Sequence, residues 1–219
     1  GPARLRAIVF KFIQEDEARM TTLKTGETQV IDEIPPASVK ELRASRDYNV
    51  YIIPKYGVSR SYHFNVDLPP TNDIAIRRAI VHAIDRDGIV KTVLQGVYPP
   101  AYTVLVPGTK YYDKSLEPLV AYDPQKAKQI LEEAGWKLGP DGIREKGGQK
   151  ARVVLALFPG FVAEAPSEYA QAELRQVGID LTIKVMDGTA MMQGIAQKNS
   201  TFNMALVGSY DPDPTTLLY

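Results

Sequence analysis

The feature of this sequence that most restricts its fold is a strand–helix–strand unit between residues 151 and 187. The run "ARVVLALF" (151–158) is rich in aliphatic and β-branched residues and predicts a buried strand. Pro166 then marks the start of a predicted helix that ends at Gly178. The run "IDLTIKVMD" (179–187) alternates apolar and polar residues, which is typical of a strand with one buried face.

The remainder of the chain repeats this alternation of strand-like and helix-like segments. β-branched and aromatic residues predict strands at 4–14, 28–32, 48–54, 59–66 and 202–210. Capping residues, prolines and terminating glycines predict helices at 16–26, 35–45, 73–95, 123–135 and 189–197. A small hairpin is expected around Asp141 and Gly142. We therefore expect an α/β or α+β fold with a mixed β-sheet flanked by helices.

The segment 73–95 is expected to form a pair of scaffold helices. Its first half places four apolar residues on one helical face, namely Ile76, Ile80, Ala83 and Ile84. Asp85 then supplies the N-cap of a second helix that ends at Gly96. Neither half carries a nucleophile, a metal-binding cluster or a phosphate-binding loop. These helices are therefore predicted to support a site without contributing chemistry to it.

Residues 97–122 form a segment without periodicity that is rich in proline and tyrosine. A loop of this length is usually functional or packed against a surface. Its tyrosines could stack on a ligand or seal the loop onto its own domain, and sealing is the more common arrangement. The candidates are four of its five tyrosines, Tyr98, Tyr102, Tyr111 and Tyr112.

Charge and cysteine content exclude several classes of function. The 26 basic and 26 acidic residues cancel, so no net field favours nucleic acid or an anionic membrane surface. The chain has no cysteine, which excludes disulfides, zinc–thiolate sites and thiol catalysis. No apolar run reaches the length of about 18 residues that a membrane-spanning helix needs.

Motifs of common enzymes are missing from the sequence as well. No serine lies in a G-x-S-x-G turn, and the Walker, H-E-x-x-H and G-x-G-x-x-G patterns do not occur. Only two histidines, His63 and His82, offer a general base. Asp211 and Asp213 could do acid–base work, but a proline-bounded turn need not bring them together. We expect no catalytic residue, no metal site held by this chain and no cofactor.

Three stretches carry a resemblance to a known family. They are "YHFNVDLPPTNDIAIRRAIVHAIDRDGIVKTVLQG", "YDPQKAKQILEEAGW" followed by "DGIREKGG", and "FNMALVGSYDPDP". In their order and spacing they resemble the family 5 extracellular solute-binding proteins of ABC transporters, the dipeptide-, oligopeptide- and nickel-binding group. The resemblance runs from about Leu5 to the last residue.

This resemblance implies a fold, a partner set and a location. It implies that residues 1–219 are a single solute-binding lobe of a type II periplasmic-binding-protein-like fold. Family members look longer, so it implies a missing first lobe of the same chain and a ligand gripped between the two lobes. The ligand would be a small polar solute, such as a peptide, an opine or sugar conjugate, or a metal chelate. An ABC permease in the membrane would receive it from a periplasmic or extracytoplasmic membrane-anchored parent protein.

The resemblance also places candidate ligand contacts in "GSYDPDP", at Gly208, Ser209, Tyr210 and Asp211. Many peptide-binding members carry a tryptophan where Ser209 stands here, together with an aspartate that pairs with the amino group of the ligand. Asp211 is the candidate for that aspartate, although this stretch is about two residues shorter than the commonest form. The alternative is a simple turn, because residues before proline are restricted to extended or turn geometry.

Three residues of the predicted strand 59–66 form the second group of candidates. Alternation places Tyr62 on one face of the strand and His63 and Asn65 on the other. Part of this group is expected to face the ligand cleft. The alternative for His63 is a hydrogen bond at the strand end, as for most histidines, and His82 is expected to be structural.

A ligand-sensing domain of a regulator or receptor, built on the same fold, is the alternative function. The sequence upstream in the parent gene would separate the two functions. An export signal would indicate the transporter protein, whereas a DNA-binding helix-turn-helix would indicate the regulator.

Overall fold

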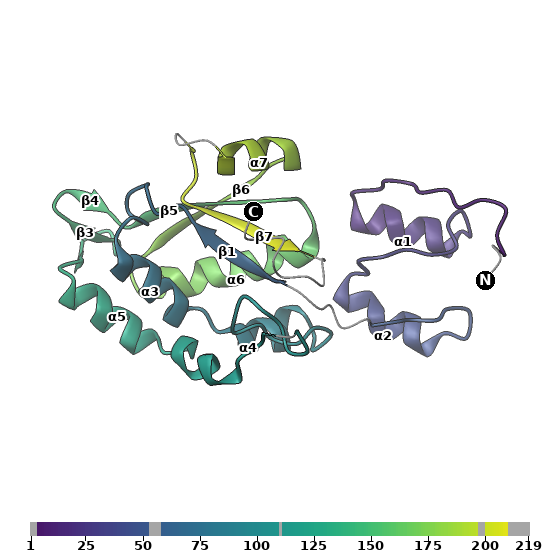
Figure 1. The fold of residues 1–219 in the computed structure, drawn as a ribbon, viewed down its shortest axis with the longest axis horizontal. Helices are drawn as coiled ribbons and strands as arrows, with labels where there is room; N and C mark the ends of the chain where they lie inside the picture. The colour runs from purple at the N-terminus through teal and green to yellow at the C-terminus, as the bar shows by residue number, and fades with distance from the viewer. Residues whose placement is uncertain (1–3, 53–57, 110, 197–199, 210–219) are drawn as a thin grey trace.

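The structure is a computed structural model that describes residues 4–52, 58–109, 111–196 and 200–209. A four-stranded mixed sheet lies at its centre (Figure 1). The strand order is β1-β7-β5-β6. Their bounds are β1 Val58–Phe64, β5 Arg152–Leu157, β6 Asp180–Val185 and β7 Met204–Ser209. The central pairs β5–β6 and β5–β7 are parallel, whereas β1 is antiparallel to β7. Helices flank the sheet, so the predicted α/β class with a mixed sheet is confirmed (Figure 1).

The helix α6 (Phe161–Gln176) makes the crossover between the parallel strands β5 and β6. It begins before Pro166, so the predicted helix start is wrong. The side chain of Glu164 accepts a hydrogen bond from the backbone N–H of Gly160 (2.8 Å) and satisfies one donor at the helix start. Pro166 then lies inside the helix, where its missing N–H removes one backbone bond.

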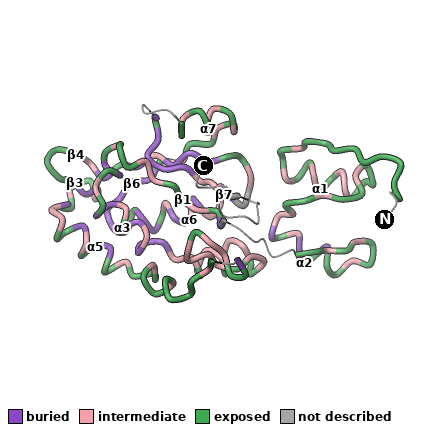
Figure 2. Tube along the Cα trace, viewed as in Figure 1, coloured by how far each residue is buried: buried purple, intermediate pink, exposed green. Residues whose placement is uncertain are grey.

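The two faces of the sheet are covered unequally. The larger core lies beneath α3 (Ile74–Ala83), α5 (Pro124–Glu133) and α6, and includes the buried Leu155 and Met204. On the other face a small cluster around Met191 packs beneath α7 (Gly188–Ala196). Figure 2 shows the buried segments gathered between the sheet and these helices. Among the described residues, this second face is covered by the single short helix α7.

The predicted scaffold helices are confirmed, with an irregular second member. Three of the four apolar residues lie on the first helix, α3, the fourth, Ile84, is the extended residue that follows it, and all four are buried. The side chain of Asp85 accepts a hydrogen bond from the backbone N–H of Gly88 (2.8 Å), as expected of an N-cap. The second helix is a short α4 (Arg86–Gly88) that continues as a π-helical turn over Ile89–Val93. It contacts α6, so the pair supports the sheet from below.

The segment between α3 and β5 is stabilised by local packing. A 3-10 helix covers Lys114–Val120 within the long loop. Three short strands form a second sheet that contains the predicted hairpin: β2 (Lys137–Leu138), β3 (Arg144–Lys146) and β4 (Gln149–Lys150). Trp136 is buried, and its indole N–H donates to the carboxylate of Asp73 (3.0 Å). The indole therefore joins this small sheet to the N-terminus of α3.

Residues 4–52 stand apart from the sheet, as a pair of helices joined by irregular chain (Figure 1). The helices are α1 (Asp16–Lys24) and α2 (Pro36–Ala44). The strands predicted at 4–14, 28–32 and 48–54 are wrong for the described residues, which contain no strand there. Phe12 is 98% exposed in this segment. A strand needs a neighbouring backbone to pair with, and the described residues offer none at this place. The connection to the sheet, 53–57, lies outside the described residues, so the single-lobe division stays a prediction.

Candidate functional site

The end of the sheet that faces residues 4–52 is the candidate site (Figure 1). The carboxyl ends of the parallel strands β5, β6 and β7 lie at this end, and the antiparallel strand β1 begins there. In open α/β sheets, ligands bind outside the carboxyl ends of the strands. The site is therefore framed by the start of β1, the end of β7 and the loops that lead into α6 and α7.

Carboxylates accept backbone hydrogen bonds at the N-termini of both helices at this end. Glu164 accepts from Gly160 at the start of α6, and Asp187 accepts from the backbone N–H groups of Thr189 (2.9 Å) and Ala190 (3.1 Å) at the start of α7. A capped N-terminus has fewer free donors and a compensated positive end. These helices therefore position the loops of the site and do not offer ready anion pockets.

Arg60 is a basic side chain that the fold brings to this end, and the sequence reasoning missed it. It lies on β1 beside a register irregularity between Val58 and Ser61. One of its guanidinium nitrogens lies 2.6 Å from a carboxylate oxygen of Glu33, which belongs to the 4–52 segment. The pair therefore bridges the sheet and the helices across the end of the strands.

Gly208 has a steric reason to be glycine at this position. A Cβ atom added there would lie 2.9 Å from the Cγ atom of Arg60. Real Cβ atoms essentially never approach a neighbour this closely, so a larger residue would displace the arginine side chain. The absence of a side chain at Gly208 thus leaves room for Arg60, which pairs with Glu33.

The two groups of predicted contact residues lie at opposite ends of the β1–β7 pair. Ser209 is the register partner of Val58, whereas the backbone N–H of Asn65 donates to the carbonyl of Asn203 (2.7 Å) at the start of β7. Five residues of strand separate Arg60 from Asn65, which corresponds to about 17 Å. Gly208 and Ser209 belong to the candidate site, and the structure does not bring His63 and Asn65 to them.

Tyr62 points to the face opposite His63, as the alternation predicts. Its ring packs against the larger core, and its hydroxyl donates to the Oγ atom of Ser167 on α6 (3.1 Å). Burial raises the pKa of this hydroxyl above its ordinary value, which keeps it in the donating form. Tyr62 therefore fixes β1 against α6 from below the sheet.

His63 and Asn65 lie at a separate, small hollow of 180 Å³ between the end of β1 and α7. The Nε2 atom of His63 lies 3.1 Å from the Oγ atom of Ser61, and burial lowers the pKa of the imidazole. The side-chain oxygen of Asn65 accepts from the backbone N–H of Asp67 (3.0 Å), which is a turn that ends the strand. Both side chains already have local partners here.

The remaining predicted residues are placed as follows. Tyr210 and Asp211 lie outside the described residues, and Ser209 is described only as the last residue of β7. His82 is buried, and its Nδ1 atom lies 2.9 Å from the carbonyl oxygen of Ala121. Tyr102 and Tyr112 bond to Asp87 and Glu117, within the loop and the helix beside it.

Two further properties of the described residues also bear on the site. They contain no group of three or more histidine, aspartate or glutamate side chains that could hold a metal ion. None of the helices among them combines the length and the apolar character that crossing a membrane requires.

Comparison with known proteins gives the same family along the whole chain. A family model described as "Bacterial extracellular solute-binding proteins, family 5 Middle" matches residues 1–219. The nickel-binding periplasmic protein of Escherichia coli K12 is 38% identical over 122 residues, which cover 54% of this chain and 23% of that protein. The oligopeptide-binding protein AppA of Bacillus subtilis is 29% identical over 212 residues, which cover 95% of this chain and 38% of that protein.

The structural comparison agrees with the sequence comparison. The crystal structure of NikA from Brucella suis in complex with Fe(III)-EDTA superposes with a TM-score of 0.77 and 30% identity, over 91% of this chain and 41% of that chain. This chain thus spans about two fifths of the length of AppA and NikA.

Proposed function

This chain belongs to the bacterial extracellular solute-binding proteins of family 5, and from this premise we propose that it captures a small polar solute for import. In the proposal the solute binds at the carboxyl ends of β5, β6 and β7, between the sheet and a first lobe of the same parent protein. Closure of the two lobes then holds the solute until an ABC permease accepts it. The chain forms one wall of this site and catalyses no reaction.

The Arg60–Glu33 ion pair is the observation that carries the proposal. It joins the sheet to residues 4–52 across the carboxyl ends of the strands, at a separation of 2.6 Å. One member of an exposed ion pair can leave its protein partner and bind a charged group of a ligand at little net cost in free energy. Such an exchange would couple solute binding to closure.

The chemistry of this end of the sheet favours a polar solute with at least one carboxylate. Arg60 supplies a planar donor pair that suits a carboxylate. Gly208 and Ser209 supply strand-end backbone groups, and Tyr210 and Asp211 remain proposed contacts beyond the described residues. Peptides and metal chelates both carry carboxylates. A metal would arrive chelated, because the described residues offer no cluster of metal ligands.

The proposed partners and location follow from the family. The solute is the ligand, the first lobe completes the site, and the permease receives the cargo. The parent protein is proposed to be periplasmic or anchored outside the cytoplasmic membrane. The relative from Escherichia coli is itself named a periplasmic protein.

Native mass spectrometry of the purified parent protein would identify a co-purified solute. Isothermal titration calorimetry with an oligopeptide mixture and with Fe(III)-EDTA would then measure affinity for the two ligand classes. We expect one of these classes to bind the parent protein, and Gly208→Val to weaken that binding at least tenfold, because its side chain displaces Arg60.

Arg78→Ala is the matched control, because Arg78 is an exposed arginine on α3. We expect this variant to keep the affinity of the parent. Equal affinity of the Gly208→Val variant and the parent, with both folded by circular dichroism, would contradict the proposed site. Binding of the solute by the 219-residue chain as tightly as by the parent would contradict the two-lobe account.

A further inference from the structure

The strand β6 leaves a row of backbone groups at the edge of the sheet. It is the last strand in the order β1-β7-β5-β6. Asp180 donates its backbone N–H to Ala151 (2.9 Å), and Met186 donates to Leu157 (3.0 Å), so the even-numbered residues of β6 bond toward β5. In a strand, successive residues turn their N–H and C=O groups to opposite sides. The odd-numbered residues of β6 therefore present these groups outward.

One outward group is already capped by a side chain. The amide of Gln171 on α6 donates to the carbonyl oxygen of Leu181 (2.6 Å). The backbone N–H and C=O groups of Ile183 and Val185 have no hydrogen-bond partner within the part of the chain that the structure describes. An open row of this kind is a template for pairing with another strand. The open edge thus covers the second half of β6.

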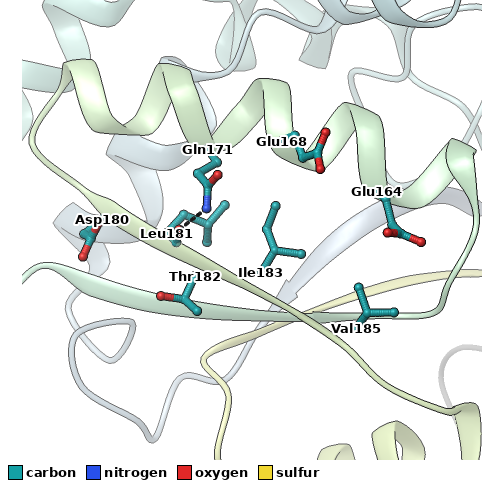
Figure 3. A pocket seen from close by; sticks show the side chains of 8 residues that line it. All are labelled: Glu164, Glu168, Gln171, Asp180, Leu181, Thr182, Ile183 and Val185. Carbon is teal, nitrogen blue, oxygen red and sulfur yellow. Dashed lines mark hydrogen bonds between the residues drawn. The ribbon is translucent and has the colours of Figure 1, made fainter.

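A groove of 530 Å³ follows this edge between β6 and α6. Figure 3 shows its lining, with side chains of α6 above the strand and the Gln171–Leu181 bond near one end. Glu164, Glu168 and Gln171 are spaced by four and three residues, so they share one face of α6. Val185 is 46% exposed at the far end of the groove. The strand edge therefore lies beneath a wall that carries two carboxylates.

These two carboxylates are not neutralised by a cation of the described residues. Glu164 accepts a backbone hydrogen bond, and Glu168 has no ion pair. Asp180 differs, because Arg152 and Arg175 lie 3.5 Å and 3.1 Å from its oxygens. No lysine or arginine lines the groove. Its charge therefore complements a cationic occupant along the stretch where the backbone is open.

We propose that the β6 edge docks an extended basic segment of a partner polypeptide, which pairs with Ile183 and Val185 and sets alternate lysine or arginine side chains against Glu164 and Glu168. The spacing agrees. Four helical residues separate the two carboxylates by about 6 Å along α6. Alternate residues of a strand lie about 6.6 Å apart. Backbone pairing gives affinity in such strand addition, and side chains give specificity.

A fluorescein-labelled peptide, acetyl-Lys-Val-Lys-Val-Lys-Thr-amide, tests this docking by fluorescence anisotropy. We expect it to bind the protein, and expect the peptide with glutamate in place of each lysine to bind at least tenfold more weakly. Two N-methylated versions of the lysine peptide test the backbone pairing without any change to the protein. One is methylated at its odd-numbered residues and the other at its even-numbered residues. One frame faces β6 and should lose binding, whereas the other should keep it.

Variants of the protein test the two walls of the groove separately. The double variant Glu164→Gln/Glu168→Gln should weaken binding of the lysine peptide about tenfold, at about threefold per exposed charge pair. Glu133→Gln, on the exposed side of α5, is the matched control and should change it less than twofold. Val185→Pro removes one outward N–H, which edge strands tolerate, and should weaken binding at least fivefold.

Backbone amide chemical shifts of Ile183 and Val185 should move on titration with the peptide. Absence of binding at millimolar peptide, unchanged affinity in the double variant, retained affinity in both N-methylated frames, or shifts confined to another surface would each overturn the proposal. This docking goes beyond solute capture, although Glu164 and Val185 also lie at the end of the sheet that holds the candidate solute site. A variant on β7 distinguishes the two kinds of binding. Gly208→Val should weaken solute binding and leave the lysine peptide bound.

Discussion

The two edges of the sheet are protected to different degrees, although both are formed by strands of similar length. At the β1 edge, Ser59 donates its backbone N–H to the carbonyl of Val104 (2.8 Å), and its hydroxyl lies within bonding distance of Thr103 and Val104. The long loop thus pairs with that edge at Ser59. At the β6 edge, a single side-chain amide caps one carbonyl. An edge strand without such cover is open to pairing with another chain.

This difference indicates where the molecule is stable and where it can interact. The β1 edge lies next to the candidate solute site, and a strand that slips or pairs wrongly there would move Arg60. The β6 edge lies on the far side of the central strand β5. The strand β5 thus separates this edge from Gly208 on β7 and from Arg60 on β1. The predictions below test how far the two edges differ from each other and from the centre.

The largest effect is expected at the central strand. Leu155 is fully buried in the larger core, so Leu155→Ala should lower the free energy of unfolding by about 3 kcal/mol. Ile183 on β6 is only half-buried, and Ile183→Ala should cost about 1 kcal/mol. Chemical denaturation of both variants measures the difference. Equal losses would mean that β6 is as well enclosed as β5.

Much of the fold could be predicted from local sequence signals. Asp123 and Pro124 start α5 as expected, because an aspartate cap and a proline at the first position act within one turn. The strand–helix–strand unit was predicted from β-branched content, a proline and a glycine that bound the helix, and the alternation of residues 179–187. The segment 4–14 shows the limit, because its residues favour strands but form none. Propensity describes a segment, whereas a strand also needs a partner that the sequence of that segment does not specify.

The second prediction concerns the closed edge. Ser59→Ala removes a hydroxyl that is buried against two carbonyls of the long loop, and we expect a loss of about 1 kcal/mol. Backbone amides near Val104 should then exchange faster with deuterated solvent. Ser61→Ala, two residues along the same strand, is the control and should cost less, because its contact with the carbonyl of Ser59 is long (3.4 Å) and its contact with the Nε2 atom of His63 (3.1 Å) is exposed to water. An equal cost would contradict the special role of Ser59.

The candidate site was less predictable than the fold, because it depends on strand direction and register. Gly208 and Ser209 were predicted from the resemblance, and the antiparallel pairing of β1 then determines what lies beside them. That pairing places Arg60 next to Gly208 and puts Asn65 at the other end. The sequence shows alternation within β1, but it does not show which end of β1 meets the end of β7. A basic residue near the start of a strand that enters the site was the available signal for Arg60.

The third prediction concerns the partial cap of the open edge. Gln171→Ala removes the donor to the carbonyl of Leu181, and we expect a loss of about 0.5 kcal/mol, because water can replace the amide at an open groove. Gln176→Ala at the exposed end of α6 is the matched control and should be neutral. Unfolding in denaturant measures both. If Gln171→Ala lowers the free energy of unfolding as much as Ser59→Ala, the two edges depend equally on their caps. That result would contradict the difference between the two edges.

The smallest effect is expected from the buried carboxyl of Glu173. It helps to hold the end of the long loop that pairs with the β1 edge. Glu173 on α6 accepts from the backbone N–H of Asp85 (2.8 Å), and its carboxyl faces Asp85, Arg86, Tyr122 and Tyr169. Burial raises the pKa of Glu173 above its ordinary value, and the negative charge of Asp85 adds to this, against the opposing hydrogen bonds and Arg86.

A carboxyl with a raised pKa in the folded state stabilises the fold most at low pH. Its contribution is fully present below the unfolded-state pKa of about 4.3 and is lost as the pH rises through the folded-state pKa. The free energy of unfolding should therefore fall less between about pH 4 and pH 7 in Glu173→Gln than in the parent chain, because the amide keeps the acceptor but does not titrate. Glu168→Gln on the same helix should retain the slope of the parent. A parent-like slope in Glu173→Gln would show that this carboxyl does not couple pH to the anchoring of the loop.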